Sequence, residues 1–123
     1  MTTRSAVVPQ SIVILGPTAS GKSSVAMAVA LSDVGQQLGI ELVSIDAMQV
    51  YRGMDIGTAK PSIDEQQSVR HHLIDLVDAT ESFTVAEFQL AYHSAISDIA
   101  SRQGRALLVG GTGLYVRAVV DEL

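Results

Sequence analysis

The stretch GPTASGKS at residues 16–23 constrains the fold of this 123-residue chain more than any other feature. It satisfies the pattern G-x-x-x-x-G-K-[ST], follows the apolar run Ser11–Leu15 and precedes a segment dense in Ala, Val, Met and Leu. Glycines let a backbone curl so that consecutive N–H groups face an anion, and the positive end of a following helix favours negative charge. A chance glycine turn is the alternative, but the motif has both of the flanks it needs. The pattern predicts a strand, a phosphate-binding loop and a helix.

The loop carries one cation with a hydroxyl beside it. Lys22 can reach the outer phosphates, and the Ser23 hydroxyl can bind Mg²⁺. The residues predicted to bind a diphosphate or nucleotide are Gly16, Pro17, Thr18, Ala19, Ser20, Gly21, Lys22 and Ser23. Kinases, ATPases and other transferases share such a loop, so the motif alone leaves open which molecule carries the phosphates.

Strands and helices alternate along the chain. We expect a helix over Lys22–Leu38 that ends before Gly39, a strand over Glu41–Ile45 and a strand over Ala106–Val109. Residues 49–78 lack sustained periodicity and are expected to form mostly loop with short elements. This alternation predicts an α/β fold of the P-loop type, with three layers and a parallel sheet covered on both faces. Because three strands make a small sheet with exposed edges, the sequence looks like the N-terminal part of a larger protein.

A later helix has a clear start in the stretch FTVAEF. Thr84 can cap this helix while the Glu87 side chain reaches back to the cap amide. Phe83 and Phe88 flank the two at staple positions. Apolar and aromatic residues then recur at helical spacing at Phe88, Tyr92, Ile96 and Ile99. Gly104 is expected to end the helix.

Two more strand ends bring chemistry to the edge of the sheet where the phosphate loop lies. Asp46 follows the second strand, where it can bind Mg²⁺ through water or accept a hydrogen bond from a substrate; a turn-forming Asp is an equal alternative. Residues 110–113, GGTG, end the third strand, where glycines bring backbone close to a ligand and Thr112 offers a hydroxyl and an N–H. A glycine-rich turn alone would explain the glycines but not the threonine.

Composition narrows the class of protein. Thirteen acidic and eight basic residues give a net charge of −5, which by itself argues against a nucleic-acid partner. The absence of cysteine excludes disulfides and thiol-based metal sites and fits a cytoplasmic protein. The first ten residues do not form a signal peptide, and no apolar run approaches the roughly 18 residues of a membrane span. We expect a soluble, cytoplasmic protein without a membrane partner.

Five motifs occur in order along the chain: GPTASGKS, DAMQVYRGMDIGTAKP, HHLID, FTVAEF and LLVGGTGLY. With them the chain, from Ile12 to its end, strongly resembles the N-terminal part of the tRNA dimethylallyltransferases, also called tRNA isopentenyltransferases. The resemblance implies transfer of a dimethylallyl group from dimethylallyl diphosphate to the exocyclic N6 of the adenosine beside the tRNA anticodon, with Mg²⁺. It also implies an inserted helical domain and a basic C-terminal portion, which this chain lacks. The net charge of this part therefore need not reflect that of the whole enzyme, and residues 1–123 alone are expected to be inactive.

The resemblance also implies roles for individual residues. The loop at 16–23 would hold the isoprenoid diphosphate with Mg²⁺ on Ser23, and Asp46 would contact the adenine N6 and act as base. Thr112 would lie near the diphosphate and the target nucleotide. The tRNA-contacting residues so implied are Asp46, Ala47, Met48, Gln49 and Thr112, although many family members have Ser in place of Ala47. The partners so implied are dimethylallyl diphosphate and the tRNA anticodon stem-loop, and we expect the complete enzyme to be a monomer.

Some polar residues of these motifs receive no catalytic role. Tyr51, Arg52 and Lys60 lie in the longest motif without a specific assignment. His71, His72 and Asp75 could suggest a metal site, but adjacent residues of an extended segment point to opposite faces. We therefore expect local structure and hydrogen bonding for them.

Three other functions remain alternatives. A small-molecule or nucleotide kinase would use the same loop for ATP, but it would need a lid whose arginine closes over the phosphates, and nothing after Gly113 supplies such a lid. An adenylate isopentenyltransferase would modify free nucleotides and would need no basic clamp for tRNA. A non-catalytic phosphate-binding module is the third.

Overall fold

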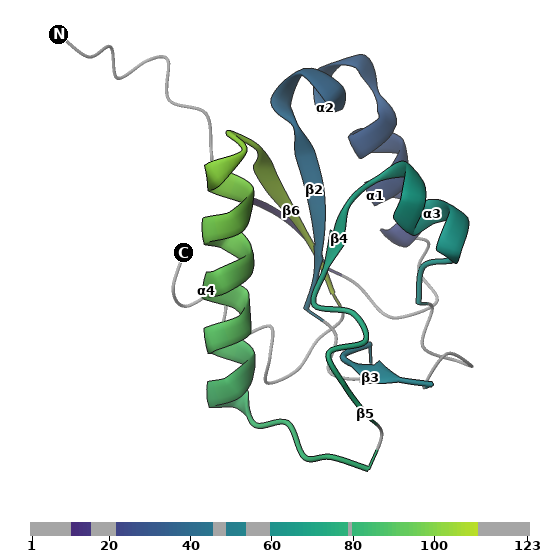
Figure 1. Cartoon of the computed structure of the whole chain (residues 1–123). Helices are drawn as coiled ribbons and strands as arrows, with labels where there is room; N and C mark the ends of the chain where they lie inside the picture. The colour runs from purple at the N-terminus through teal and green to yellow at the C-terminus, as the bar shows by residue number, and fades with distance from the viewer. Residues whose placement is uncertain (1–10, 16–21, 46–48, 54–59, 79, 111–123) are drawn as a thin grey trace, which may run out of the picture.

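The computed structural model describes residues 11–15, 22–45, 49–53, 60–78 and 80–110. Within these residues the chain forms a three-layer α/β fold with a central parallel sheet between its helices (Figure 1). The central sheet contains β1 (Ser11–Leu15), β2 (Ile40–Ser44), β4 (His71–His72) and β6 (Arg105–Gly110). The helices are α1 (Lys22–Leu31), α2 (Asp33–Leu38), α3 (Ile63–Ser68) and α4 (Val85–Ser101). A smaller sheet pairs β3 (Tyr51–Arg52) with β5 (Val77–Asp78). The predicted α/β class is confirmed.

The order of the central sheet is β1-β6-β2-β4, with every pair parallel. Leu15 pairs with Gly110 and Ser44 pairs with Val109, so β1, β6 and β2 end almost level with one another. The carboxyl ends of these three strands therefore form one edge, which we call the C-terminal edge of the sheet. Open α/β sheets bind their ligands at such an edge.

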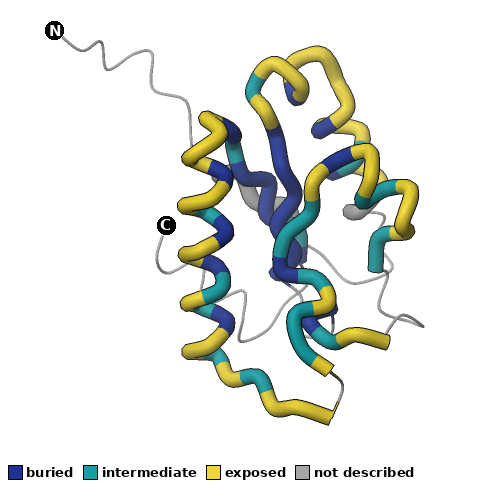
Figure 2. The backbone as a smooth tube through the Cα atoms, in the orientation of Figure 1, coloured by how far each residue is buried: buried dark blue, intermediate teal, exposed yellow. Residues whose placement is uncertain are grey.

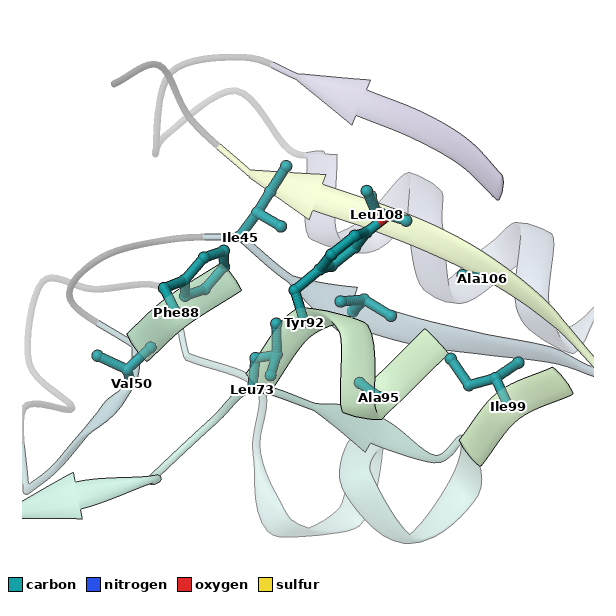
Figure 3. Packing of buried hydrophobic residues seen from close by; sticks show 10 residues of the cluster. Ile45, Val50, Leu73, Phe88, Tyr92, Ala95, Ile99, Ala106 and Leu108 are labelled. Carbon is teal, nitrogen blue, oxygen red and sulfur yellow. The ribbon is translucent and has the colours of Figure 1, made fainter. Parts of the chain in front are cut away.

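Each face of the sheet is covered by its own hydrophobic cluster. On the α4 side, Phe88, Tyr92 and Ile99 pack against strand residues such as Val43 and Leu108 (Figure 3). On the α1 side, Ala26 and Ala30 pack against residues of β2 and β6 (Leu42 and Leu107). Figure 2 shows buried positions all along β2, as expected for a parallel strand enclosed between helices.

The helix expected over Lys22–Leu38 is wrong in one respect, because the structure divides it at Ser32. Ser32 has extended backbone angles (φ −64°, ψ 162°), and its hydroxyl oxygen accepts from Gly35 N at 3.0 Å as the N-cap of α2. A cap side chain bonded to a neighbouring backbone group competes with continuation of the helix. Gly35 permits the tight packing of the two helices, since a Cβ there would lie 2.1 Å from the Val29 carbonyl oxygen. The predicted end at Gly39 is confirmed by its left-handed φ of 65°.

The expectation of a three-stranded sheet is also wrong, because β4 adds a fourth strand. His71 pairs with Leu42 and His72 pairs with Val43, which makes β4 an edge strand of two residues. Two residues are too few to show any periodicity, so the pairing depends on β2 as a template. The strand expected over Glu41–Ile45 forms one residue earlier, over Ile40–Ser44.

Helix α4 begins as predicted. Thr84 accepts from Glu87 N at 3.1 Å, and Glu87 accepts from Thr84 N at 2.9 Å, which completes the capping box. The predicted role of Gly104 as the end of the helix is wrong, because Gln103 takes the left-handed conformation instead (φ 60°). Gly104 is needed for packing, since a Cβ there would lie 2.6 Å from the Gly39 carbonyl oxygen.

The described helices include none with the length and apolar character needed to cross a membrane.

Candidate functional site at the carboxyl ends of the strands

The C-terminal edge brings three predicted motifs together through their strands. The phosphate loop follows Leu15, Asp46 comes two residues after Ser44, and GGTG begins at Gly110. Because these strand ends are adjacent in register, the three strands that precede the motifs end at one edge, as expected from the sequence. The predicted site residues Gly16, Pro17, Thr18, Ala19, Ser20, Gly21, Asp46, Ala47, Met48 and Thr112 lie outside the described residues.

Helix α1 begins at the predicted phosphate loop. Lys22 and Ser23 are its first two residues, and its first turn contains no acidic side chain. The free N–H groups and positive end of a helix favour an anion, and no carboxylate in this first turn offsets that charge. Ala26 and Ala30 hold α1 against the sheet. The described backbone therefore suits a phosphate group at the start of α1.

Gly110 lets β6 approach the end of β2 closely. A Cβ at this position would lie 2.4 Å from Ile45 Cγ1, and Ile45 N donates to the Val109 carbonyl at 3.0 Å. The sequence reading attributed the glycines of GGTG to a close ligand. For Gly110 the close neighbour in the structure is Ile45, so packing of the two strand ends accounts for this glycine.

Gln49 is the one predicted tRNA-binding residue that the structure describes. The residue is only 8% exposed, and its Oε1 accepts a hydrogen bond from Ser44 Oγ at 2.7 Å. Ser44 is 7% exposed. The hydrogen bond between the two residues is therefore buried, and it joins Ser44, the last residue of β2, to Gln49. Sequence reasoning missed Ser44, and only its place two residues before Asp46 could have drawn attention to it.

The HHLID motif and the residue after it bind the backbone of Gln49 and Val50. Asp75 N donates to the Gln49 carbonyl at 3.0 Å, and Leu76 N donates to the Val50 carbonyl at 2.7 Å. Leu73 and Asp75 have left-handed φ angles of 68° and 56°, conformations that are uncommon for residues other than glycine. Its backbone contacts thus fix Gln49 and Val50.

Lys60 joins the two motifs. Its Nζ donates to the Tyr51 carbonyl at 2.9 Å and lies 2.5 Å from Asp75 Oδ1, with only 6% of the side chain exposed. Arg52 forms an exposed ion pair with Asp78 at 2.9 Å. Lys60 and Arg52, to which the sequence assigned no role, thus join the strand Tyr51–Arg52 to Asp75 and Asp78.

A small recess lies beneath the C-terminal edge on the α1 side. It is lined by Met27, Val109 and other apolar residues, with Ser44, Gln49 and His71 among its polar groups. Its volume of about 30 Å³ has room for roughly two water molecules. Burial lowers the pKa of His71, and the hydrogen bond from its Nδ1 to the Val69 carbonyl at 2.7 Å only partly opposes this. The lowered pKa favours a neutral imidazole here.

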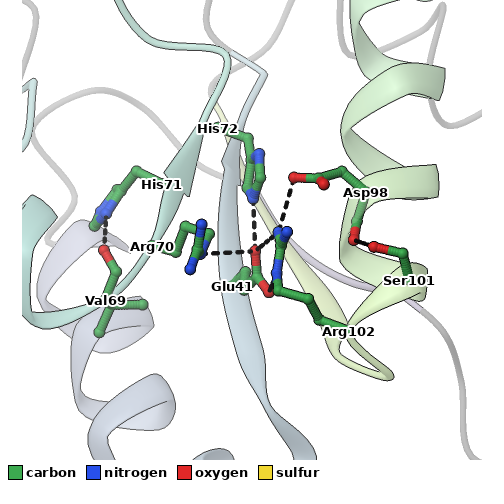
Figure 4. Close-up of polar contacts among 8 residues, drawn as sticks. All are labelled: Glu41, Val69, Arg70, His71, His72, Asp98, Ser101 and Arg102. Carbon is green, nitrogen blue, oxygen red and sulfur yellow. Dashed lines mark hydrogen bonds and ion pairs between the residues drawn. The ribbon is translucent and has the colours of Figure 1, made fainter.

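His72 points to the other side of the sheet, as expected for adjacent residues of a strand. Its Nε2 donates to Glu41 Oε1 at 2.7 Å, so hydrogen bonding by both histidines is confirmed. Glu41 also accepts two hydrogen bonds from Arg102 (Figure 4). Glu41 is near the start of β2, so this cluster belongs to the opposite end of the sheet from the candidate site. Among the described residues no three His, Cys, Asp or Glu side chains form a group that could hold a metal ion.

Comparisons with known proteins agree with these features. A protein-family model described as IPP transferase matches residues 49–123. The tRNA dimethylallyltransferase of Desulforudis audaxviator is 54% identical over 114 residues, which cover 93% of this chain and 35% of that protein. The tRNA dimethylallyltransferase of Bifidobacterium longum is 50% identical over 112 residues, which cover 89% of this chain and 34% of that protein. The chain therefore spans about a third of the length of these curated relatives.

Two solved structures have the same fold. The full-length tRNA isopentenylpyrophosphate transferase of Bacillus halodurans superposes with a TM-score of 0.78 at 46% identity, over 94% of this chain and 37% of that one. A eukaryotic dimethylallyltransferase described as acting on tRNA gives a TM-score of 0.78 at 32% identity, over 91% of this chain and 27% of that one.

Proposed function

This chain belongs to the IPP transferase family, and we propose that the protein containing it transfers a dimethylallyl group from dimethylallyl diphosphate to N6 of the adenosine beside the tRNA anticodon. The observation that carries the proposal is the match to tRNA dimethylallyltransferases over almost the whole chain. The phosphate-loop pattern alone would not distinguish this reaction from phosphoryl transfer.

The chain would supply the diphosphate-binding core of such an enzyme. In these relatives, the sequence outside the matched third is about twice as long as the matched part. We propose that an inserted helical domain and a basic C-terminal portion occupy this additional length and grip the tRNA. Basic groups outside residues 1–123 would then compensate for the net charge of −5 within them.

The diphosphate would lie at the start of α1. The first turn of α1, which begins with Lys22 and Ser23 and has no carboxylate, fits a phosphate group with a bound Mg²⁺, because hydroxyl and phosphate oxygens are the ligands that this ion takes. When bound, Mg²⁺ would neutralise negative charge on the diphosphate. Lys22 would stabilise the further charge that develops on the diphosphate oxygen as the carbon–oxygen bond breaks.

Asp46 would act on the acceptor adenine. The N6 amine is a weak nucleophile because its lone pair is delocalised into the ring. A carboxylate hydrogen-bonded to N6–H can orient the amine and take its proton as the new carbon–nitrogen bond forms, a contribution of typically 10²–10⁴-fold. The diphosphate leaves with the electron pair of the broken bond. Thr112 would bind near the diphosphate and the target nucleotide, and residues 46–48 would contact the tRNA. Direct contact of Gln49 with tRNA stays a prediction. In this structure the residue is buried.

The test uses a transferase of the relatives' full length whose first third is this chain. Lys22→Ala should weaken binding of dimethylallyl diphosphate and nearly abolish transfer to tRNA. Asp46→Asn should lower the single-turnover rate by roughly 10²-fold or more while diphosphate binding stays nearly intact. If binding collapses and chemistry survives in Asp46→Asn, the assignment of Asp46 as base is wrong.

The same assay separates the alternative functions. Labelled dimethylallyl diphosphate and labelled ATP are each incubated with the protein, with tRNA and with free AMP as acceptors. The proposal requires label from dimethylallyl diphosphate on tRNA. Label from ATP would indicate a kinase, and prenyl label only on AMP would indicate an adenylate isopentenyltransferase.

A further inference from the structure

We propose that one flank of α1 is an interface for the part of the protein that lies outside residues 1–123. This outer flank consists of Val25, Ala28 and Val29. Val25 is 53% exposed, Val29 is 37% exposed, and Ala28 is exposed between them. The occupant is an apolar segment of the same polypeptide. The inference depends on the greater length of the relatives and not on the transfer reaction.

Helix α1 lacks the charged face that a surface helix normally has. After Lys22 the next charged residue is Asp33, which lies beyond Leu31, the last residue of α1. Within the described residues, Ala26 and Ala30 pack α1 against β2 and β6, and the outer flank is left exposed. A helix without a charged face is normally enclosed by other elements. The composition of α1 therefore fits a helix with a neighbour on its outer flank as well.

Helix α4 provides a contrast. Its Leu90 is 72% exposed, more than either valine of the outer flank. The exposed residues about one turn from Leu90 include Glu87, His93 and Ser94, which are polar. A single exposed apolar side chain among polar ones is common on protein surfaces. Leu90 therefore needs no partner, whereas the outer flank of α1 is apolar over a full turn.

The outer flank faces the side of the sheet where β1 lies. Met27 lines the recess with Leu42 of β2 and His71 of β4, so Met27 points toward the β4 edge of the sheet. Val25 and Val29 are each two positions from Met27, which corresponds to about 200° around a helix. They therefore lie on the opposite flank of α1, toward β1 at the other edge of the sheet.

Strand β1 gives a second reason to place more polypeptide on this side. Among the described strands, β1 pairs with β6 alone, so its other edge has no neighbour there. Free strand edges and apolar surface are both features that soluble proteins cover. The shared region is only 35% and 34% of the two curated relatives, which leaves ample sequence to cover both. A linked segment also has a high effective concentration, which favours it over a second copy of the protein.

The first test is Val29→Lys in the same full-length transferase. Lysine has a better helix propensity than valine, and position 29 is in the last turn of α1, where a cation is favourable. On a flank open to water, the midpoint of thermal unfolding would stay the same or rise. On a covered flank the variant buries a charge, so we expect the midpoint to fall by several degrees.

The matched control is Gln67→Lys. Gln67 is exposed near the end of α3, and α3 lies on the Met27 side of α1. This variant adds the same charge to a helix away from the outer flank and should leave the midpoint unchanged. A midpoint for Val29→Lys that is no lower than that of Gln67→Lys would overturn the proposal.

The second test identifies the occupant. A photoreactive benzoylphenylalanine in place of Val29 should cross-link, within one polypeptide, to a residue outside residues 1–123. A cross-link between two copies, a cross-link within residues 1–123, or no cross-link at all would overturn the proposal. Neither test measures catalysis, so a full-length protein that transfers no dimethylallyl group would contradict the proposed function without affecting this result.

Discussion

Replacing Glu41 by Gln should destabilise the fold, because this carboxylate joins three elements. Its Oε2 accepts from Arg102 Nε at 2.9 Å, and its Oε1 accepts from Arg102 Nη2 and His72 Nε2, each at 2.7 Å. Arg70 Nε lies 3.8 Å from Oε1. Glu41 is on β2, His72 is on β4 and Arg102 follows α4, so the cluster fixes the edge strand and the helix to the sheet (Figure 4).

The magnitude follows from the number of donors and their exposure. Glutamine has the same shape but keeps only one acceptor oxygen, and its NH₂ group would face donors. A hydrogen bond to a charged group is worth about 1.5–3 kcal/mol, and breaking a buried ion pair costs about 3–5 kcal/mol. The Glu41 side chain is 10% exposed, but that of Arg102 is 32% exposed and can turn to water, which reduces the loss. We expect Glu41→Gln to lower the free energy of unfolding by about 2 kcal/mol at pH 7.

The dependence on pH provides a second signature. Burial raises the pKa of Glu41, but hydrogen bonds from Arg102 and His72 outweigh it and leave the pKa below its ordinary value of 4.5. A depressed carboxyl pKa contributes stability that is present above the unfolded pKa and is lost as pH falls through the folded pKa. Glutamine does not titrate. The difference between parent and variant should therefore be largest near neutral pH and should shrink as pH falls below about 4.5.

The assay is urea unfolding of parent and variant at several pH values between 3 and 7. Asp98→Asn serves as the matched control, because Asp98 binds the same Arg102 at 2.9 Å but is exposed. It should change the free energy of unfolding much less than Glu41→Gln does. A loss for Glu41→Gln no larger than that of the control, or one that does not change with pH, would refute the reasoning.

Three further predictions concern other parts of the fold. Thr84→Ala should lower the free energy of unfolding by about 1 kcal/mol, because the backbone N–H of Glu87 loses its hydrogen-bond acceptor. Urea unfolding measures this free energy, and an unchanged value would contradict the role of the capping box. Gly104→Ala should lower the free energy of unfolding by about 2 kcal/mol, because the added Cβ would lie 2.6 Å from the Gly39 carbonyl oxygen. An unchanged free energy in the same assay would show that the backbone can move there. Burial lowers the pKa of His71, so the unfolded state binds its proton more readily, and the parent should lose stability as pH falls below 6.5. His71→Gln should lose less between pH 6.5 and 5.5, and equal slopes of stability against pH would argue against this account.

The local pattern of residues was enough to predict several elements. The capping box at Thr84 and the left-handed cap at Gly39 are satisfied within a few residues of chain, so the sequence contains all of their partners. The alternation of apolar strands with helices was enough to predict a parallel sheet, because few other arrangements bury such segments on both sides. The phosphate-loop pattern and the motifs beside it were enough to predict the family.

Other features depended on contacts between residues far apart in the chain. The His71–His72 strand exists because β2 offers it a free edge, and Gly104 is a glycine because the Gly39 carbonyl lies against it. Lys60 resembles a solvated side chain in the sequence, but it is buried because Asp75 and the Tyr51 carbonyl meet it there.

The sequence by itself determined which charged residues, hydroxyl residues and glycines follow the end of each strand. It could not show that Ser44 and Gln49 bond to each other, because Gln49 begins a stretch that the sequence predicted to be mostly loop. Only the tertiary structure decided that they are buried together, by covering them with α1 and the strands that line the recess. The physical reason is that the energy of a polar side chain depends on what surrounds it, and those surroundings come from distant parts of the chain.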